Sequence, residues 1–213
     1  HMDDEVLGMG GTLAKHVAAG HRITVCIACN RAYDHRFDPK TIEEEKDCAR
    51  AAAGILGYRD IRFLDLRDEL LDERLLDTLV PLESCVRDVR PEVVYTHHRG
   101  DVNQDHRAVF RATLIACRAI ADFKVKKILA YEVPSSTDMA PPFPEFAFQP
   151  NFYVDISASL DRKIEAMKAY TRELREFPHP RSLKGIEVLA QKRGMDVGCR
   201  AAEAFQVIRD EWI

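Results

Sequence analysis

The chain has 213 residues, with 31 lysines and arginines against 35 aspartates and glutamates and a formal net charge of −4. This length suits one domain with a buried core and is short for two. Charges of both signs are interspersed, which argues against nucleic-acid binding. The opening shows no signal-peptide pattern, and the longest apolar run, residues 23–29, is too short for a membrane span. We expect a cytoplasmic globular protein.

Helices and strands alternate over the first two thirds of the chain. In chain order the pattern predicts a helix at 11–19, a strand at 22–29, a helix at 41–56 that stops at Gly57, a strand at 61–64, a helix at 73–89, a strand at 93–96, a helix at 105–120 and a strand at 127–132. Such alternation is typical of a parallel sheet with helices on both faces. We therefore predict an α/β, Rossmann-like fold with a mostly parallel sheet.

The pattern changes after residue 133. A proline-rich loop at 134–150 leads to a short strand around 152–156 and a helix from about Ser159. Two shorter helical pieces and a last strand near 205–208 close the chain. We expect one domain over 1–213, with an α/β core at 1–133 and a small C-terminal extension at 134–213.

The opening residues look like the turn after a strand. A parallel α/β fold normally starts with a central strand, whereas this chain starts with polar residues. We expect either that a first strand precedes His1 or that His1 and Met2 are tag residues.

Two cysteines, Cys26 and Cys29, form a Cys-x-x-Cys pair within a predicted buried strand. Residues three apart on a strand point to opposite faces. We therefore interpret this pair as small buried hydrophobic residues in a reducing compartment, and not as a redox or zinc motif.

Polar side chains gather where the predicted strands end, which is where open parallel sheets bind ligands. They are His1, Asp3, Asp4 and Glu5 after the expected first strand, Asn30, Arg31, Asp34, His35 and Arg36 after the second, and His97, His98, Asp101, Asn103, Asp105 and His106 after the strand at 93–96. Imidazoles and carboxylates suit zinc or another first-row divalent ion. The sequence therefore predicts a metal site.

Two of these segments carry a family resemblance. His-Met-Asp-Asp-Glu at residues 1–5 resembles the Ala-His-Pro-Asp-Asp-Glu motif of the LmbE-like (PIG-L) zinc-dependent N-deacetylases. Gly-Asp-Val-Asn-Gln-Asp-His at 100–106 resembles that family's second motif, and the stretches 131–136, 177–182 and 202–205 are also similar to family members. The resemblance spans nearly the whole chain.

The resemblance implies a role for four residues. His1, Asp4 and His106 match the family's zinc ligands, and Asp3 matches its general base. Two imidazoles and one carboxylate leave the ion a net positive charge and an open position for water, whose pKa the ion lowers toward ~7. Asp3 would take a proton from that water and pass it to the departing amine.

The chain departs from the family pattern at two positions. Met2 replaces the motif's proline. Asn103 stands where many members have a histidine that hydrogen-bonds the oxyanion or protonates the leaving group. Asparagine can donate a hydrogen bond to the oxyanion, so Asn103 stays a candidate catalytic residue, but it cannot supply a proton. The acid is therefore Asp3 alone, or else His97 or His98. Because neighbouring strand residues face opposite sides, we expect only one of the two histidines to face the site, and we favour His97.

The resemblance implies removal of an N-acetyl group from an amino sugar of the N-acetylglucosamine type, or from its conjugate. Arg36, Arg31 and Arg193 are candidates for binding this substrate. One alternative is a metal-dependent amidase that acts on a non-sugar amide.

Another alternative is a non-catalytic Rossmann-like binding module that uses the glycine turn at 8–11. Leu13 occupies the place of the third glycine in a dinucleotide fingerprint, so we expect these glycines to let a helix pack closely on the sheet. A homo-oligomer is compatible with the sequence.

Overall fold

The computed structural model describes residues 1–119 and 123–211. Its α-helices are α1 (Asp4–Ala18), α2 (Pro39–Leu56), α3 (Leu75–Val89), α4 (Gln104–Ala116), α5 (Leu160–Lys168) and α6 (Leu183–Val197), with a 3₁₀ turn, η1 (Thr137–Met139). Its strands are β1 (Thr24–Asn30), β2 (Asp60–Arg67), β3 (Val93–His97), β4 (Lys127–Tyr131), β5 (Phe152–Asp155) and β6 (Ala202–Asp210). Elements therefore alternate through β4, as the hydrophobic pattern predicts.

The strands form two separate groups. β1 pairs with β2 in parallel, and β3 pairs with β4 in parallel. β6 pairs antiparallel with both β4 and β5, which gives the order β3-β4-β6-β5. The prediction of a mostly parallel sheet is therefore correct only for the first four strands. β5 and β6 belong to the part of the chain where regular strand–helix alternation has ended, and parallel pairing needs a crossover between strands.

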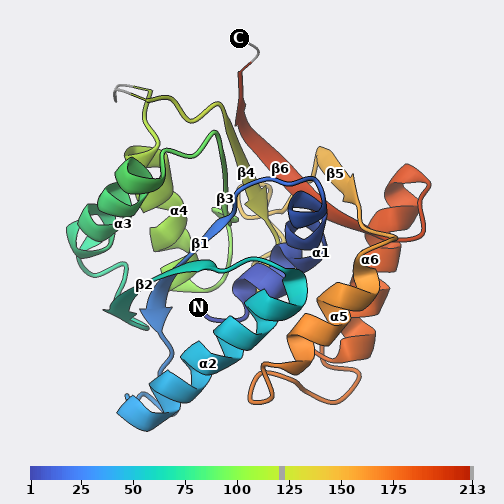
Figure 1. Ribbon diagram of the computed structural model, residues 1–213, viewed down its shortest axis with the longest axis horizontal. Helices are drawn as coiled ribbons and strands as arrows, with labels where there is room; N and C mark the ends of the chain where they lie inside the picture. The colour runs from blue at the N-terminus through green and yellow to red at the C-terminus, as the bar shows by residue number, and fades with distance from the viewer. Residues whose placement is uncertain (120–122, 212–213) are drawn as a thin grey trace.

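Helices cover both faces of the strands (Figure 1). α1, α2 and α5 pack together on one side, and α3 packs on α4 on the other. β1 alternates between the two layers: Val25 and Ile27 belong to the apolar cluster of α1 and α2, whereas Cys26 packs on Leu79 and Leu82 of α3. Within the described ranges, no helix is long and apolar enough to cross a membrane.

The first helix begins earlier than the pattern predicts. α1 starts at Asp4, seven residues before the predicted start at Gly11, because the early glycines weaken the helical pattern. α2 ends before Gly57 as predicted, with this glycine at φ 97°. The predicted end of the 105–120 helix lies outside the described residues, and α4 ends at Ala116. The two short C-terminal helical pieces are one helix, α6.

Two glycines of α1 pack closely on neighbouring elements. A Cβ atom at Gly8 would lie 2.3 Å from the ring of Tyr131 on β4, and one at Gly11 would lie 2.8 Å from Ile156. The prediction that these glycines allow close packing of the helix is therefore confirmed.

A buried ion pair holds the kink of α1. Met9 departs from helical geometry (φ −150°, ψ 23°), which leaves the next backbone N–H groups without helical partners. Gly11 and Thr12 donate these N–H groups to the carboxylate of Glu203, at 2.9 and 2.6 Å. Lys163 donates its Nζ to Glu203 at 2.7 Å. The pair therefore ties the middle of α1, at its kink, to β6 and α5.

Candidate metal centre and general base

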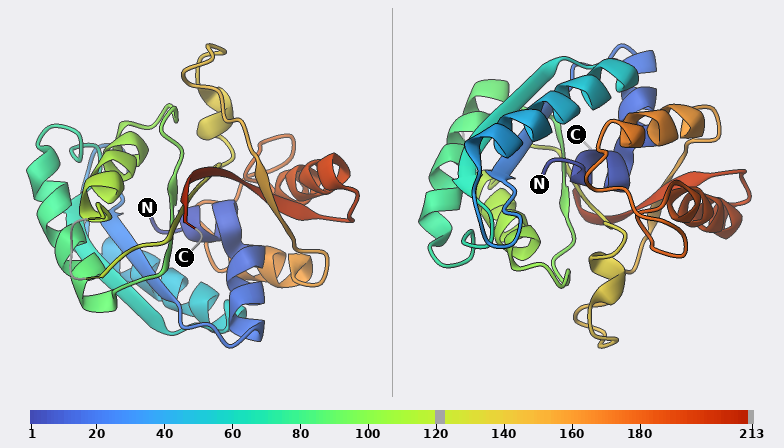
Figure 2. Two further views of the ribbon diagram at one scale, coloured as in Figure 1. Left: turned by 90° about the horizontal axis from the view of Figure 1, so that it is seen from above. Right: turned by 90° about the horizontal axis from the view of Figure 1, so that it is seen from below.

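The chain brings the two sequence motifs together at the carboxyl ends of β1 and β3. Asp3 and Asp4 stand at the start of α1, His97 ends β3, and His106 lies in the first turn of α4. All four side chains are buried. Figure 2 shows the N-terminus between these strand ends.

Three side chains direct ligand atoms at a common point. His1 Nδ1 lies 3.2 Å from both Asp4 Oδ2 and His106 Nε2, and His106 Nε2 lies 3.1 Å from Asp4 Oδ2. The α-amino group of His1 also donates to Asp4 Oδ2 at 2.7 Å. Asp4 Oδ1 is buried and has no hydrogen-bond partner among the described residues. Two imidazoles and an incompletely satisfied carboxylate fit a zinc ion or another first-row divalent ion.

Each of the two histidines makes a second contact to a carboxylate. His1 Nε2 lies 2.7 Å from Asp68 Oδ1, and His106 Nδ1 lies 3.1 Å from Asp101 Oδ2. Such carboxylates fix the tautomer of a ligating imidazole and orient its ring. The inner ring nitrogens, His1 Nδ1 and His106 Nε2, are therefore the ones left for a cation.

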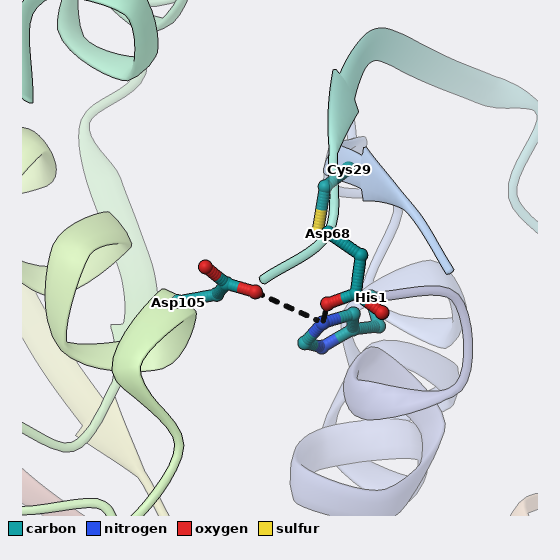
Figure 3. Close-up of side chains that lie close together, drawn as sticks. All are labelled: His1, Cys29, Asp68 and Asp105. Carbon is teal, nitrogen blue, oxygen red and sulfur yellow. Dashed lines mark hydrogen bonds and ion pairs between the residues drawn. The ribbon is translucent and has the colours of Figure 1, made fainter. Parts of the chain in front are cut away.

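His1 also belongs to a second group of possible ligands, with Cys29, Asp68 and Asp105 (Figure 3). Asp105 Oδ2 lies 3.7 Å from His1 Nε2. However, both oxygens of Asp105 accept backbone N–H groups, from Glu69 and Leu71. Asp68 likewise accepts the N–H groups of Ala32 and Glu69. These carboxylates are therefore satisfied by the loops after β1 and β2, which is consistent with a supporting role.

The charges within the group are strongly coupled. Burial opposes the charged form of His106, yet Asp4 and Asp101 raise its pKa to about 9. Burial likewise opposes ionisation of Asp4, but His106, His1 and His97 hold its pKa well below the usual value. The protons on the imidazoles balance the carboxylates, and a bound cation would replace them.

Asp3 is adjacent to the ligand group but does not belong to it. Its backbone has φ 106°, a strained conformation for a residue other than glycine, and its side chain is fully buried. Arg31 lies 3.4 Å from Oδ1, and Arg181 lies 3.0 Å from Oδ2. Burial raises the pKa of Asp3, the two arginines lower it and Asp4 raises it, with a net value of about 7. This carboxyl group is suited to exchange a proton near neutral pH.

The network that holds Asp3 includes three residues that sequence reasoning missed as site residues, namely Arg181, Glu173 and Tyr33. Glu173 Oε2 lies 2.8 Å from Arg181 NH1 and 3.4 Å from Arg31 NH1, and Tyr33 donates its hydroxyl to Glu173 Oε1 at 2.7 Å. Arg181 falls within the family-like stretch 177–182, which was the only sequence signal for this network. Arg31 therefore contacts the predicted general base.

His97 faces the ligand group and His98 faces away, as the strand alternation predicts. His97 Nε2 lies 3.1 Å from Asp4 Oδ2 and 3.2 Å from the hydroxyl of Tyr131. Burial and the neighbouring His106 lower the pKa of His97, which favours its neutral form. His98 Nε2 instead lies 3.0 Å from the backbone oxygen of Phe146. Tyr131 was not among the predicted site residues.

The other predicted site residues lie elsewhere. Asn103 is the N-cap of α4: its Oδ1 accepts the N–H groups of Asp105 and His106, at 2.8 and 3.4 Å. Arg36 is exposed in the loop after β1. Arg193, on α6, makes a bidentate ion pair with Glu132 at 2.6 and 2.7 Å. The structure therefore brings together the side chains of His1, Asp3, Asp4, Arg31, His97 and His106. It places Asn103 beside them as the cap of α4 and leaves Arg36 and Arg193 outside this group.

Comparisons with known proteins identify the family to which this chain belongs. Residues 1–117 match the family described as "PIG-L: GlcNAc-PI de-N-acetylase". An uncharacterized deacetylase of Escherichia coli, YaiS, is 34% identical, with 64% of this chain and 71% of the relative covered. The 1D-myo-inositol 2-acetamido-2-deoxy-alpha-D-glucopyranoside deacetylase of Actinosynnema mirum is 26% identical, with 82% of this chain and 78% of the relative covered.

A solved structure shows the same fold. The N,N'-diacetylchitobiose deacetylase of Pyrococcus horikoshii superimposes with a TM-score of 0.77 at 18% identity, over 98% of this chain and 80% of its own. The match over residues 1–117 covers both motifs that form the ligand group. This chain belongs to the PIG-L (LmbE-like) deacetylase family.

Proposed function

We propose that this protein is a zinc-dependent hydrolase that removes the N-acetyl group from an amino sugar of the N-acetylglucosamine type, or from its conjugate. One observation carries the proposal: His1, Asp4 and His106 converge, while the buried carboxyl of Asp3 lies beside them without joining the group. The names of the relatives support the substrate class. The fold by itself does not determine the reaction.

Each residue of the site has its own role in the reaction. His1, Asp4 and His106 would hold a zinc ion, which supplies Lewis acidity and lowers the pKa of water. Asp3 accepts the proton of the attacking water and returns it to the amine that leaves. Arg31 and Arg181 hold the Asp3 carboxylate in place through the contacts described above.

Neutral His97 donates a hydrogen bond toward the oxygen of the cleaved carbonyl, and Tyr131 orients its ring. Asn103 supports the site by capping α4 and so fixing His106. Arg36 and Arg193 stay candidates for substrate binding at the rim, by the family resemblance alone. The free cysteines suit a reducing compartment such as the cytoplasm.

Acetate release tests the proposal. The zinc-loaded protein should release acetate from N-acetylglucosamine or its short oligomers and not from N-acetylcysteine. Asp3→Asn should reduce this rate by about 10²- to 10⁴-fold. Asp47→Asn, an exposed aspartate on α2, is the matched control and should keep the rate of the wild type.

Other outcomes identify the alternatives. Faster hydrolysis of N-acetylcysteine would favour the amidase with a non-sugar substrate. Sugar binding that survives Asp3→Asn, with no acetate released by the wild type, would favour the non-catalytic binding module.

A further inference from the structure

A run of hydroxyl side chains follows β4, at Ser135, Ser136 and Thr137. These residues form the turn between β4 and η1, in which the backbone N–H groups of Ser136 and Thr137 donate to the oxygen of Val133. β4 is hydrogen-bonded on both sides, to β3 and to β6, and it ends level with β3. Residues 135–137, called the hydroxyl turn below, therefore extend from a strand with two partners, at the sheet edge where the site lies.

Two of the hydroxyl groups hold the carboxylate that orients His106. Ser136 donates its hydroxyl to Asp101 Oδ1, and Thr137 donates its hydroxyl to Asp101 Oδ2, the latter at 2.6 Å. The same Oδ2 lies 3.1 Å from His106 Nδ1. All of these side chains are buried, and a buried carboxylate that loses a donor is not compensated by water. Ser136 and Thr137 therefore fix the group on which the orientation of the His106 ring depends.

Ser135 acts on the other part of the site. Its hydroxyl accepts the Nε–H of Arg181 at 2.7 Å. The NH1 group of this guanidinium is shared between Asp3 Oδ2, at 3.0 Å, and Glu173 Oε2, at 2.8 Å. Among the described residues, the other hydrogen bonds of the Arg181 side chain all go through NH1, so without Ser135 the guanidinium could rotate about that nitrogen. Ser135 therefore fixes the plane of a group that contacts Asp3.

The backbone of the turn allows neighbouring hydroxyl groups to reach different partners. Ser135 has φ 67°, in the left-handed region, whereas Ser136 has φ −139°. The contact from Ser135 spans 46 positions to Arg181, and the contact from Ser136 spans 35 positions to Asp101. A left-handed conformation is unfavourable for a residue with a Cβ atom, and such conformations gather at functional sites. The turn thus keeps an unfavourable conformation at the residue that contacts Arg181.

We propose that the hydroxyl turn positions the general base and a metal ligand relative to each other. Ser135 positions the base, Asp3, through Arg181. The two residues that follow it position the ligand, His106, through Asp101. This inference rests on the proposed function, which supplies the roles of the base and the ligand. Because a displacement of about 1 Å can cost on the order of 10²-fold in rate, one turn that fixes both groups protects the geometry of the reaction.

Two alanine substitutions separate these roles. Ser136→Ala should weaken Co²⁺ binding by about 10- to 100-fold, because the orienting carboxylate loses a donor. Ser135→Ala should bind Co²⁺ as the wild type does. It should instead lower kcat for acetate release by about 10- to 100-fold at an unchanged KM, because the base is displaced while substrate binding is kept. Ser84→Ala, at an exposed position on α3, is the matched control and should change neither quantity.

The measurements use the metal alone and a defined substrate. A competition titration against a chromogenic chelator gives the Co²⁺ affinity of the metal-free protein. Initial rates with N-acetylglucosamine oligomers give kcat and KM of the zinc-loaded protein. Ser135→Gly separates positioning from stability, because glycine adopts φ 67° readily and lacks the hydroxyl. It should show the same loss of kcat as Ser135→Ala, whereas a kcat equal to that of the wild type would overturn the role of the Ser135 hydroxyl.

The Co²⁺ affinity does not depend on turnover. A wild type that binds Co²⁺ but releases no acetate would refute the proposed function, and the inference would then stand or fall on Ser136→Ala. Equal Co²⁺ affinity in Ser136→Ala and in the wild type would overturn it. Parallel losses of Co²⁺ affinity and of kcat in both alanine variants would also overturn it, because they would reduce the turn to a general support of the fold.

Discussion

His1 and Asp68 are held 2.7 Å apart, between Nε2 of the imidazole and Oδ1 of the carboxylate (Figure 3). They are separated by 67 positions in the sequence. They meet because Asp68 directly follows β2, at the strand ends beside which His1 lies. This contact leaves Nδ1 of His1 directed at Asp4 and His106. The orientation of a ligand that the sequence motif identifies thus depends on a residue that lies outside every motif.

Asp68→Asn should weaken zinc binding by about 10- to 100-fold, because the ring of His1 loses its charged partner. A competition titration against a chromogenic chelator measures the affinity. Asp72→Asn, at an exposed position in the same loop, is the control and should bind zinc as the wild type does. Unchanged affinity in Asp68→Asn would show that His1 needs no such partner.

Gly8→Ala should lower both activity and stability, because the new methyl group would lie 2.3 Å from the ring of Tyr131. That ring contacts His97, with the ring centroids 4.9 Å apart. Overpacking of this kind costs about 1–3 kcal/mol of unfolding free energy. Gly54→Ala is the matched control, since a Cβ atom there meets open space in the last turn of α2. It should stabilise the fold by up to about 1 kcal/mol. Denaturant titration measures both, and equal stability of the two variants would contradict the packing argument.

Lys163→Met should destabilise the fold by about 3–5 kcal/mol, because it leaves the buried carboxylate of Glu203 without its cation. The double variant Lys163→Met with Glu203→Gln should recover part of this loss, since no charge then stays buried. Guanidinium unfolding of the wild type, both single variants and the double variant gives the coupling. Additive losses would mean that the pair does not act as a unit at the kink of α1.

The buried carboxyl group of Glu45 should make the stability of the fold depend on pH. Its side chain is buried, Oε2 has no partner among the described residues, and burial followed by the charge of Glu173 raises its pKa. The folded state therefore holds this proton more tightly than the unfolded state, so the group's contribution to stability falls as pH rises above the unfolded pKa. Glu45→Gln should be more stable than the wild type by about 1 kcal/mol at pH 7.5.

The gain from Glu45→Gln should vanish below pH 4, where the wild-type carboxyl is protonated in both states. Melting temperatures of the two proteins from pH 4 to pH 8 provide the measurement. A gain of the same size at both ends of this range would show that ionisation of Glu45 is not its cause.

The site residues that lie close together in the sequence could be predicted from the sequence itself. His1, Asp3 and Asp4 share one turn, and His106 follows the strand that ends at His97, so motif and strand order place them at one sheet edge. Asp68, Glu173 and Arg181 could not be found in this way. They reach the site from a loop after β2 and from the segment between α5 and α6, and their function depends on contacts that no local pattern encodes.

The fold also has elements that the sequence predicts and elements that it does not. Alternating strands and helices predict the first four strands, because each element carries its own hydrophobic period. The direction of β6 follows instead from its pairing with β4 and β5, which are 71 or more and 47 or more positions away from it in the chain. The start of α1 was predicted too late. Gly8, Gly10 and Gly11 allow close packing, but glycine is unfavourable in helices, so these residues weaken the helical pattern of the sequence.

The zinc content of the purified protein and of three variants tests the proposed metal centre. We expect about one zinc per chain in the wild type and in Asp3→Asn, and none in Asp4→Ala or His106→Ala. Asp3→Asn should keep its zinc but lose activity, which separates the base from the ligands. A well-folded wild type that binds no zinc even when zinc is added, or Asp4→Ala and His106→Ala variants that keep it, would contradict the proposed metal centre.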